Sequence, residues 1–300
     1  MKKLLIASTA LVATAGMAAA EVSLSGYAEM GIADFGGVAG VEFFNDIDVT
    51  FNLSGETDNG LTFGATIDLD EVTNAGDDNG IPNAGNDSSV WIRGAFGNLT
   101  LGETDGAQDW ANQEIGMLTS LADDHTTHAG YWGGNSMDGN NDGQILRYDN
   151  TFGDFGVAVS YEMDDTAASN DTVQVGLKYT ADLGGTSLGL GLGYADNDTT
   201  NVLSLSAKTS FSGVDVVLNY AEDDAGGDYT GIGLGYTMGD LAMTANYGEY
   251  TGGGALGALD RDGFGLAVNY SLGGGATVMA GYGDSSTGVD QFSLGLGLSF

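Results

Sequence analysis

Apolar residues alternate with small or polar residues along most of the chain from about residue 22 onward. Near the C-terminal end, Phe292, Leu294 and Leu296 occupy every second position, with Ser293 and Gly295 between them. An extended segment with this period has one apolar face and one small or polar face. Similar runs of about eight to eleven residues recur along the chain. The pattern predicts an all-β protein of about 16 strands, in which short and long connections alternate.

The connections between the runs differ in length. Short turns are predicted at 55–60, which reads GETDNG, and at Gly97–Asn98, because these residue types tolerate turn geometry. A long segment without alternation runs from about 103 to 143. No linker or change of composition divides the chain, so one domain is predicted for residues 21–300.

The first 20 residues follow a different pattern. Two lysines precede an apolar stretch that ends near Met17, and three alanines follow before Glu21. A basic start, a short apolar stretch and a small-residue site are typical of a cleavable secretory signal. The stretch is too short to serve as a membrane anchor. The sequence therefore predicts a signal peptide at 1–20 and an exported mature chain from Glu21.

The composition limits the classes of function. The chain has 7 basic and 42 acidic residues, and loss of 1–20 would remove Lys2 and Lys3 but no acid, which leaves a net charge of −37. A chain with this negative charge does not bind nucleic acid or an anionic membrane surface through a basic patch. The 52 glycines and single proline, with 42% hydrophobic residues, favour strands over long helices or disorder. Because cysteine is absent, disulfides do not hold this exported chain together.

Tyrosines stand at one end of many apolar series. They are Tyr161, Tyr179, Tyr194, Tyr220, Tyr236, Tyr247, Tyr270 and Tyr282. A soluble sandwich and a membrane barrel both give alternating strands, so alternation alone does not choose between them. A tyrosine is stable at a membrane interface because its ring lies in the apolar layer and its hydroxyl reaches the headgroups. The repetition therefore favours a transmembrane barrel with a girdle of tyrosines.

Several segments together resemble a known family. They are EVSLSGYAEMGI at the mature start, FNLSGETDNGLTFGATIDLDE, VWIRGAFGNLTLGETDGA, the long third loop, LRYDNTFGDFGVAVSYEM and the terminal Phe300. As a set they are similar to the general diffusion porins of the Gram-negative outer membrane, especially the alphaproteobacterial, Rhodobacter-like type. In that family a C-terminal strand ending in Phe is the assembly signal, and a closed barrel pairs this strand with the first one.

The resemblance implies a transmembrane antiparallel β-barrel of 16 strands, assembled as a homotrimer in the outer membrane. It also implies a third long loop that folds inward and narrows a passive, water-filled channel for small hydrophilic solutes, with no cofactor required. Residues 104–142 fit this constriction loop. Its acidic residues are Asp105, Asp109, Glu114, Asp123 and Asp124. With so many acids, we expect the channel to prefer cations.

Four of the five basic residues after residue 20 fall on the polar face of their strands. They are Arg93, Arg147, Lys178 and Lys208. On the lipid side each would cost roughly 2 to 4 kcal/mol near the membrane midplane, so a lumen-facing register is consistent. Arg93 and Arg147 resemble the basic wall that faces the acidic loop in the family and sets a transverse field there. Pairing with the wall residues Asp68, Asp70 or Asp149 is the alternative.

Two loop motifs suggest metal chemistry. The segment DGNNDGQILRYD matches the spacing of a calcium loop, because alternating oxygens around a glycine turn suit a hard cation. Its candidate ligands are Asp138, Asn140, Asp142 and Asp149. No helical pattern flanks it and its last acid is Asp, so a solvated loop is the alternative. Both histidines, His125 and His128, lie beside acids, but zinc would need a third ligand, and polar packing in the loop is the other interpretation.

Two other classes of exported protein remain open on the residues alone. An outer-membrane barrel enzyme would need a His with a Ser or Asp partner on the wall or rim, whereas both histidines lie in the third loop. A secreted calcium-binding β-roll or adhesin would need tandem nonapeptide repeats. The fragment GGDYTGIGLG at 226–235 has no tandem copy.

Overall fold

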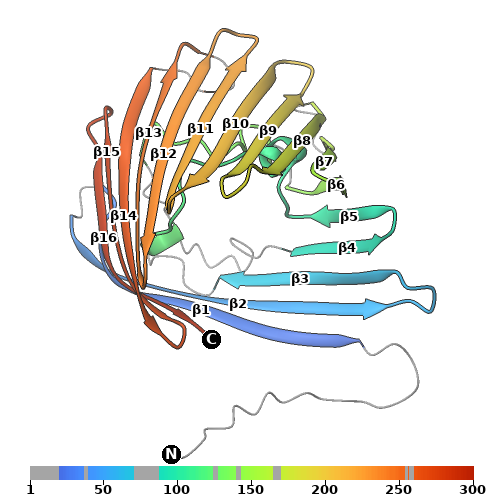
Figure 1. The fold of residues 1–300 in the computed structure, drawn as a ribbon, viewed down its shortest axis with the longest axis horizontal. Helices are drawn as coiled ribbons and strands as arrows, with labels where there is room; N and C mark the ends of the chain where they lie inside the picture. Colours follow the sequence, from blue (N-terminus) through green and yellow to red (C-terminus); the bar gives the residue numbers. More distant parts are fainter. Residues whose placement is uncertain are drawn as a thin grey trace, which may run out of the picture.

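The computed structural model describes residues 20–36, 40–70, 88–123, 128–139, 143–164, 170–253, 256 and 260–300. In this part of the chain, 16 strands form one closed antiparallel barrel, each paired with its neighbours in sequence (Figure 1). The strands are β1 (Glu21–Asp34), β2 (Glu42–Glu56), β3 (Thr62–Asp70), β4 (Ser88–Gly94), β5 (Gly97–Gly102), β6 (Ile145–Phe152), β7 (Phe155–Glu162), β8 (Thr172–Asp182), β9 (Ser187–Asp196), β10 (Asn201–Phe211), β11 (Val214–Asp223), β12 (Asp228–Met238), β13 (Leu241–Thr251), β14 (Arg261–Gly273), β15 (Ala276–Ser285) and β16 (Asp290–Ser299). The predicted fold class and strand number are confirmed.

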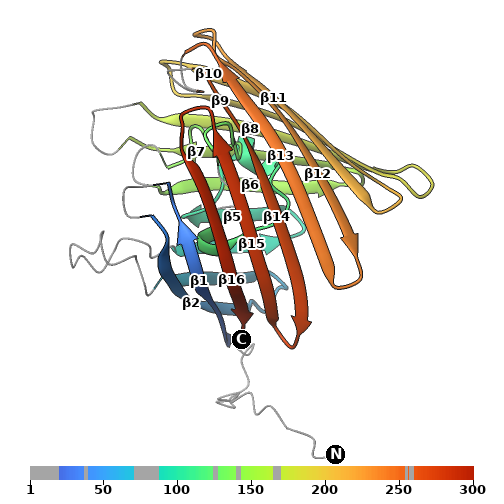
Figure 2. The ribbon, with the colours of Figure 1, turned by 90° about the vertical axis from the view of Figure 1, so that its left-hand side faces the viewer.

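The barrel closes between its first and last strands. Met30 of β1 lies opposite Leu296 of β16 in an antiparallel register, and the Phe300 N–H donates to the Gly26 carbonyl oxygen at 2.8 Å. Figure 2 shows β1 beside β16, β15 and β14 along one wall. Closure leaves no unpaired strand edge, which a sheet in a bilayer could not tolerate.

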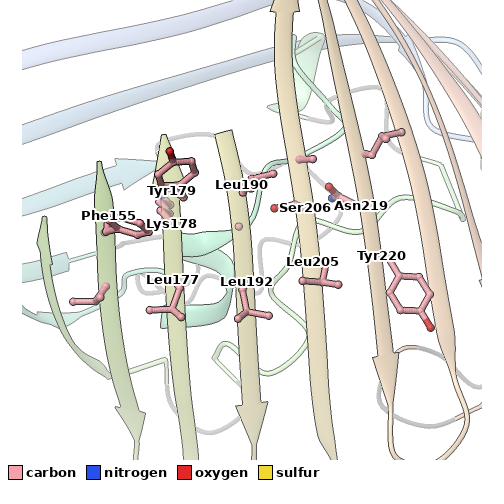
Figure 3. A pocket seen from close by; sticks show the side chains of 15 residues that line it. Phe155, Leu177, Lys178, Tyr179, Leu190, Leu192, Leu205, Ser206, Asn219 and Tyr220 are labelled. Atoms are coloured by element: carbon pink, nitrogen blue, oxygen red, sulfur yellow. The ribbon is translucent and has the colours of Figure 1, made fainter. Parts of the chain in front are cut away.

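The alternation predicted from the sequence describes the two faces of the wall. In β7, Val159 and Tyr161 are exposed on the outer surface, whereas Ala158 and Ser160 are buried inside. The outer face of β7–β11 is almost wholly apolar where Leu177, Leu192 and Leu205 line a hollow (Figure 3). The large exposed apolar surface would be costly in water, so it suits a hydrocarbon environment.

The tyrosines gather at both ends of the strands. Tyr161, Tyr194 and Tyr220 close odd-numbered strands at the end that carries the longer loops, and Tyr179 and Tyr236 lie near the ends of even-numbered strands. Several hydroxyls donate to acids at the loop end, for example Tyr194 to Asp196 Oδ2 at 2.8 Å. The side chains therefore form two girdles, as the phenol chemistry suggests.

Two turn boundaries differ from the sequence prediction. The turn expected at Gly97–Asn98 lies at residues 95–96, because Asn98 is inside β5 and pairs with Arg93 of β4. The turn expected at 55–60 begins after Glu56, since β2 continues to that residue. Glycine was a poor marker here because Gly97 has a positive φ of 115° while it still pairs within the ladder.

Helical structure in the described residues is confined to the connection between β5 and β6. This connection carries α1 (Ala107–Ala111) and the 3-10 helix η1 (Leu121–Asp123). Neither has the length or apolar character to cross a membrane, and the same holds for every helix in the ranges described. We call residues 103–144 the third loop.

Candidate functional site

The described part of the third loop lies inside the barrel. Its helix α1 contacts β7, β8 and β9, and η1 contacts β1, β15 and β16 on the other side of the lumen (Figure 1). The loop therefore follows the inner wall around much of the barrel. The inward fold expected for the third loop is confirmed.

Inward-facing side chains hold the start of α1. The Ala107 N–H donates to Ser160 Oγ of β7 at 2.8 Å, and the Gln108 N–H donates to Gln174 Oε1 of β8 at 2.9 Å. The first N–H groups of a helix have no partner within it, so these wall residues supply the missing acceptors. Because Ser160 and Gln174 are buried, the bonds fix the helix against the wall.

The middle of the loop is anchored in the same way. The Gln113 N–H donates to Ser206 Oγ of β10 at 3.0 Å. Across the lumen, the Ala122 N–H donates to Glu29 Oε2 of β1 at 2.6 Å. Polar side chains on the inner face of the barrel thus satisfy loop backbone groups that would otherwise lose hydrogen bonds on packing.

The returning arm of the loop packs on β12–β15. The Ala129 N–H donates to Ser285 Oγ at 2.8 Å, and the Tyr250 hydroxyl donates to the Tyr131 carbonyl oxygen at 2.8 Å. Trp132 packs against the ring of Tyr229, with 5.3 Å between the ring centroids. In the same hydrophobic cluster, Ile115 and Met137 of the loop are buried with these aromatic side chains, so the arm also packs on the wall through apolar contacts.

His128 belongs to this arm and is buried. Its Nε2 lies 2.6 Å from Asn246 Oδ1, and its Nδ1 accepts the Gly130 N–H at 3.1 Å. These partners require the neutral ring with its proton on Nε2. Burial lowers the pKa of His128, which favours the same form. His128 therefore packs the loop on the wall, and His125 lies outside the described residues.

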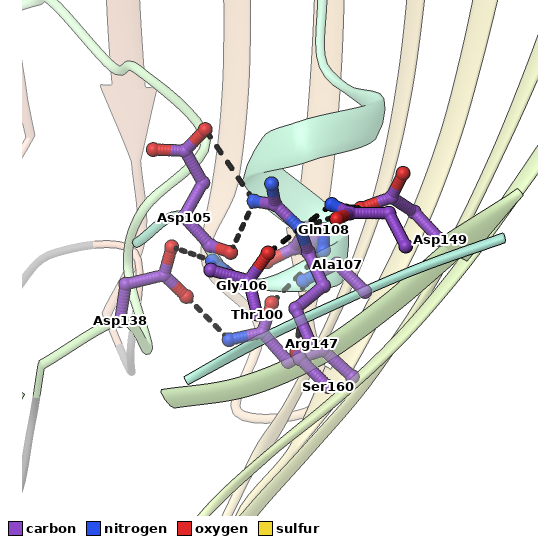
Figure 4. A network of polar contacts seen from close by, with 11 residues as sticks. Thr100, Asp105, Gly106, Ala107, Gln108, Asp138, Arg147, Asp149 and Ser160 are labelled. Atoms are coloured by element: carbon purple, nitrogen blue, oxygen red, sulfur yellow. Dashed lines mark hydrogen bonds and ion pairs between the residues drawn. The ribbon is translucent and has the colours of Figure 1, made fainter. Parts of the chain in front are cut away.

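Arg147 of β6 links the wall to the start of the third loop. Its Nη1 donates to the Asp105 carbonyl oxygen at 2.6 Å and lies 3.6 Å from Asp105 Oδ2 (Figure 4). Its Nε lies 3.4 Å from Asp149 Oδ1. Arg147 thus contacts both the acidic loop and a wall carboxylate, and its role in a transverse field stays a prediction.

The other basic residues also occupy inward-facing positions. Arg93 lies over the Trp91 ring, 4.0 Å from its centroid, and Lys178 Nζ lies 4.2 Å from the ring centroid of Trp110 in α1. Lys208 alternates with the outward-facing Ala207, as predicted. Pairing of Arg93 with Asp68 or Asp70 is not among the contacts described; its Nε donates to Asn98 Oδ1 at 2.9 Å.

Sequence reasoning did not place Arg261, the fifth basic residue. Arg261 opens β14, three residues before Phe264, and its guanidinium lies 4.4 Å from the ring centroid of Tyr250. Phe264 faces outward, so an odd spacing puts Arg261 on the inner face. The alternation would have placed Arg261 on the inner face, but the predicted strand began at Phe264 and left Arg261 out.

The acids of the third loop differ in their surroundings. Asp105 is largely exposed, and Glu114 is exposed and accepts the hydroxyl of Tyr131. Asp109 is partly buried in α1, and burial together with the charges of Asp105, Asp138 and Glu114 raises its pKa to about 8. Near neutral pH, Asp109 is therefore mostly uncharged. The side chain of Asp123 and the whole of Asp124 lie outside the described residues.

Acidic side chains also face the lumen from β2 and β3. Asp46, Asp48 and Asp68 alternate with outward-facing apolar residues, and Asp68 Oδ1 accepts the Thr50 hydroxyl at 3.0 Å. Sequence analysis did not count these acids among the pore-lining residues, although the alternation already put them on the polar face. The lumen thus has acids on β2 and β3, an acid beside Arg147 on β6, and bases on β4, β6, β8, β10 and β14.

The calcium prediction concerns residues that the structure describes only in part. Asn140 and Asp142 lie outside the described residues. The Asp138 carboxylate accepts the Gly106 N–H at 2.7 Å and bonds Gln174, while Asp149 bonds Asn98 and Arg147. The described residues contain no group of three or more acidic or histidine side chains able to hold a metal. Calcium binding stays a prediction.

Comparison with known proteins agrees with the fold. A family model described as Gram-negative porin matches residues 7–290. The porin of Rhodobacter capsulatus is 29% identical, over 93% of this chain and 99% of the relative. A porin structure refined at 1.8 Å resolution has a TM-score of 0.73 at 23% identity, and a mutant porin of Rh. blastica has 0.66 at 17%; each comparison covers 93% of this chain and 100% of the other.

The family match covers most of the chain, so it decides between the classes left open by the sequence. Porins are channel proteins and not enzymes, which removes the barrel enzyme and the secreted β-roll as interpretations. The chain belongs to the Gram-negative porin family and forms a channel in the bacterial outer membrane.

Proposed function

We propose that this porin is a passive channel for small hydrophilic solutes and ions, with a preference for cations. The observation that carries the proposal is the position of Asp105 and Glu114. Both are exposed acids on a loop that the inner wall holds by backbone hydrogen bonds. Charges fixed at such a place act on every ion that passes, whereas charges in bulk solvent are screened.

The distribution of charge supports the cation preference. All five basic residues after residue 20 stand on the inner wall, and Arg147 lies next to Asp105 and Asp149. Its positive charge is therefore largely compensated. Acids elsewhere on the wall, such as Asp46 of β2 and Asp68 of β3, have no basic residue on their own strands. Cations crossing between these groups meet a net negative potential.

The separation of charges also supports a transverse field. Bases occupy β4, β6, β8, β10 and β14, while β2 and β3 carry acids and no base, and further acids stand on the third loop and beside Arg147 on β6. A dipolar solute in this region turns so that its own charges match the field. We propose Arg93, Lys178 and Lys208 as the basic side of the constriction, with Asp105 and Glu114 on the acidic side. Asp109 joins the acidic side only at high pH.

We also propose that the protein is exported with cleavage before Glu21 and assembles as a homotrimer. The first strand, β1, starts at Glu21, so the mature chain would begin with the barrel wall. The apolar outer surface of the barrel gives self-association a surface within the membrane. Outer-membrane lipids would cover the part of this surface that neighbouring subunits leave free.

Uptake into liposomes tests the proposal. Purified protein is reconstituted, and the uptake of lysine, glutamine and glutamate is measured at equal concentration and low salt. These solutes are similar in size and differ in charge. We expect the rates to fall from lysine to glutamine to glutamate. Equal rates, or a faster rate for glutamate, would contradict the cation preference, and no uptake of any of them would contradict the channel itself.

Planar-bilayer recording tests the trimer independently. Insertion of one trimer should raise the current in a single step. At high voltage the current should then fall in three equal steps, as the three pores close one after another. A closure in one step would count against three equivalent pores.

A further inference from the structure

Several glycines on the inner face of the barrel lie very close to the backbone of the third loop. At four of these glycines, an added Cβ would fall far inside the contact distance of a loop carbonyl oxygen. The four contact glycines, with the residue whose carbonyl oxygen lies there, are Gly176 with Ala107, Gly191 with Ala111, Gly233 with Ile115 and Gly248 with Gly130. They belong to β8, β9, β12 and β13, so they follow the loop around the wall.

Backbone conformation does not explain these glycines. None of the four has a positive φ. Glycine inside a strand weakens it, because the residue loses more conformational freedom on folding and packs no side chain. A side chain would therefore be favoured at each site if the loop were absent. The close approach of the loop carbonyl is the structural reason for a glycine there.

The contacts have a favourable chemistry of their own. Because the direction of the missing Cβ points at the carbonyl oxygen, a glycine Cα–H group faces that oxygen there, which is the arrangement in which weak Cα–H···O contacts occur. Each adds little, but stronger bonds stand beside them: Ser160, Gln174 and Ser206 accept N–H groups from the same part of the loop. The wall thus binds both polar groups of the loop backbone, the N–H through its side chains and the C=O through its glycines.

Two strands contain an inward-facing glycine that lacks such a contact. In β9, a Cβ on Gly189 would meet the Gln113 side chain at 3.5 Å and the Lys208 carbonyl oxygen at 3.9 Å, both ordinary van der Waals distances. In β12, a Cβ on Gly235 would meet the end of the flexible Met117 side chain at 3.2 Å. Each of these glycines is two residues from a contact glycine on the same strand and the same face.

We propose that the four contact glycines set the width of the pore, because they let the loop backbone lie directly against the wall. This inference rests on the proposed role of the third loop as the constriction. An alanine methyl at a contact glycine would force the loop carbonyl to move by about 1 Å or more to regain van der Waals distance. The wall strand is fixed by its two neighbours, so the loop moves toward the lumen.

Gly233→Ala is the sharpest test, with Gly235→Ala as its matched control. The three atoms nearest to the added Cβ at Gly233 all belong to the backbone of Ile115, so a side-chain rotation cannot relieve the contact. Gly191→Ala and Gly189→Ala form a second pair on another strand. Single-channel conductance is measured in planar bilayers, and liposome uptake is measured for neutral sugars from monosaccharides to trisaccharides.

We expect Gly233→Ala and Gly191→Ala to lower the conductance and to lose uptake of the largest sugars that wild type admits. Uptake of monosaccharides should change least, because a narrower pore discriminates by size. Gly235→Ala and Gly189→Ala should match wild type in both measurements. A crystal structure of Gly233→Ala should show Ile115 displaced toward the lumen.

Three results would overturn the proposal. One is a contact-glycine variant with the conductance and sugar limit of its control. Another is a wider sugar limit, which would mean that the loop leaves the constriction. The third is a loss of barrel assembly, seen as lost heat-modifiable gel mobility, because it would assign the glycines to the barrel and not to the loop. A wild-type protein without conductance would instead contradict the proposed function.

Discussion

Arg147 of β6 donates from Nη1 to the backbone carbonyl oxygen of Asp105 at 2.6 Å, and this bond ties the barrel wall to the first turn of the third loop. The guanidinium also lies 3.6 Å from the Asp105 carboxylate, while its Nε reaches Asp149 at 3.4 Å (Figure 4). Its side chain is only 11% exposed. Arg147 therefore has two separable effects. The fork of N–H donors on its planar guanidinium group positions the loop, and its positive charge offsets the neighbouring acids.

Substitution of Arg147 should separate these effects. Arg147→Gln removes both the fork and the charge, so we expect a stronger cation preference together with a noisier open-channel current. Arg147→Lys keeps the charge but loses the fork, so we expect the noise without the change in selectivity. A hydrogen bond to a charged group contributes about 1.5–3 kcal/mol, and exposure of Asp105 reduces this contribution. Identical reversal potentials for wild type and Arg147→Gln would contradict the role of the charge.

The pH dependence of selectivity should depend on Asp109. Burial, and secondarily the nearby carboxylates, raises its pKa to about 8, so the group is mostly neutral at pH 7 and gains a negative charge as the pH rises through 8. Cation preference should therefore increase between pH 7 and pH 9. The increase is measured from reversal potentials in a fixed salt gradient. Asp109→Asn should abolish it, and an increase that persists in this variant would assign the titration to another group.

The wall of the barrel was readable from the sequence because alternation is a local property. Leu294 and Leu296 face outward, with Gly295 between them, as their order requires. The path of the third loop was not readable, because it depends on contacts such as Ala122 with Glu29, which lie 93 residues apart. Asp109 shows the same limit. Its residue type suggested a fixed negative charge, but its pKa depends on burial, which only the folded loop creates.

Salt should distinguish the constriction from the mouth of the channel. Asp198 is an exposed residue of the β9–β10 loop, and its φ of 63° suits asparagine, so Asp198→Asn removes one mouth charge with little strain. Screening acts over about 10 Å at 0.1 M salt and about 3 Å at 1 M. We expect Asp198→Asn to change selectivity slightly at low salt and not at 1 M. An effect of equal size at both salt concentrations would place Asp198 at the constriction.

The Asp223 carboxylate should hold two external loops together. Its Oδ1 accepts the N–H groups of Ala225 and Gly227 at 2.9 and 2.8 Å, and its Oδ2 accepts the Leu256 N–H at 3.1 Å. Asp223→Asn replaces one carboxylate oxygen by an amide NH2 group. If this group faces the Leu256 N–H, the hydrogen bond is lost and local stability falls by about 1–3 kcal/mol.

Hydrogen exchange of the Leu256 amide measures this effect. The exchange should be faster in Asp223→Asn than in wild type, while amides in the β12 ladder should keep their protection. Asp198→Asn is the control, because it also neutralises a loop acid. Unchanged protection of the Leu256 amide would contradict the assigned link between the loops.

The reversal potential of wild-type protein in a KCl gradient at neutral pH tests the central claim most directly. The claim is that a loop with exposed acids, held against the inner wall, makes the channel cation-selective. We expect the reversal potential to have the sign of the potassium equilibrium potential. Combining Asp105→Asn and Glu114→Gln should shift it markedly toward zero, even at high salt. A potential of the sign set by chloride, or a double variant indistinguishable from wild type, would contradict the claim.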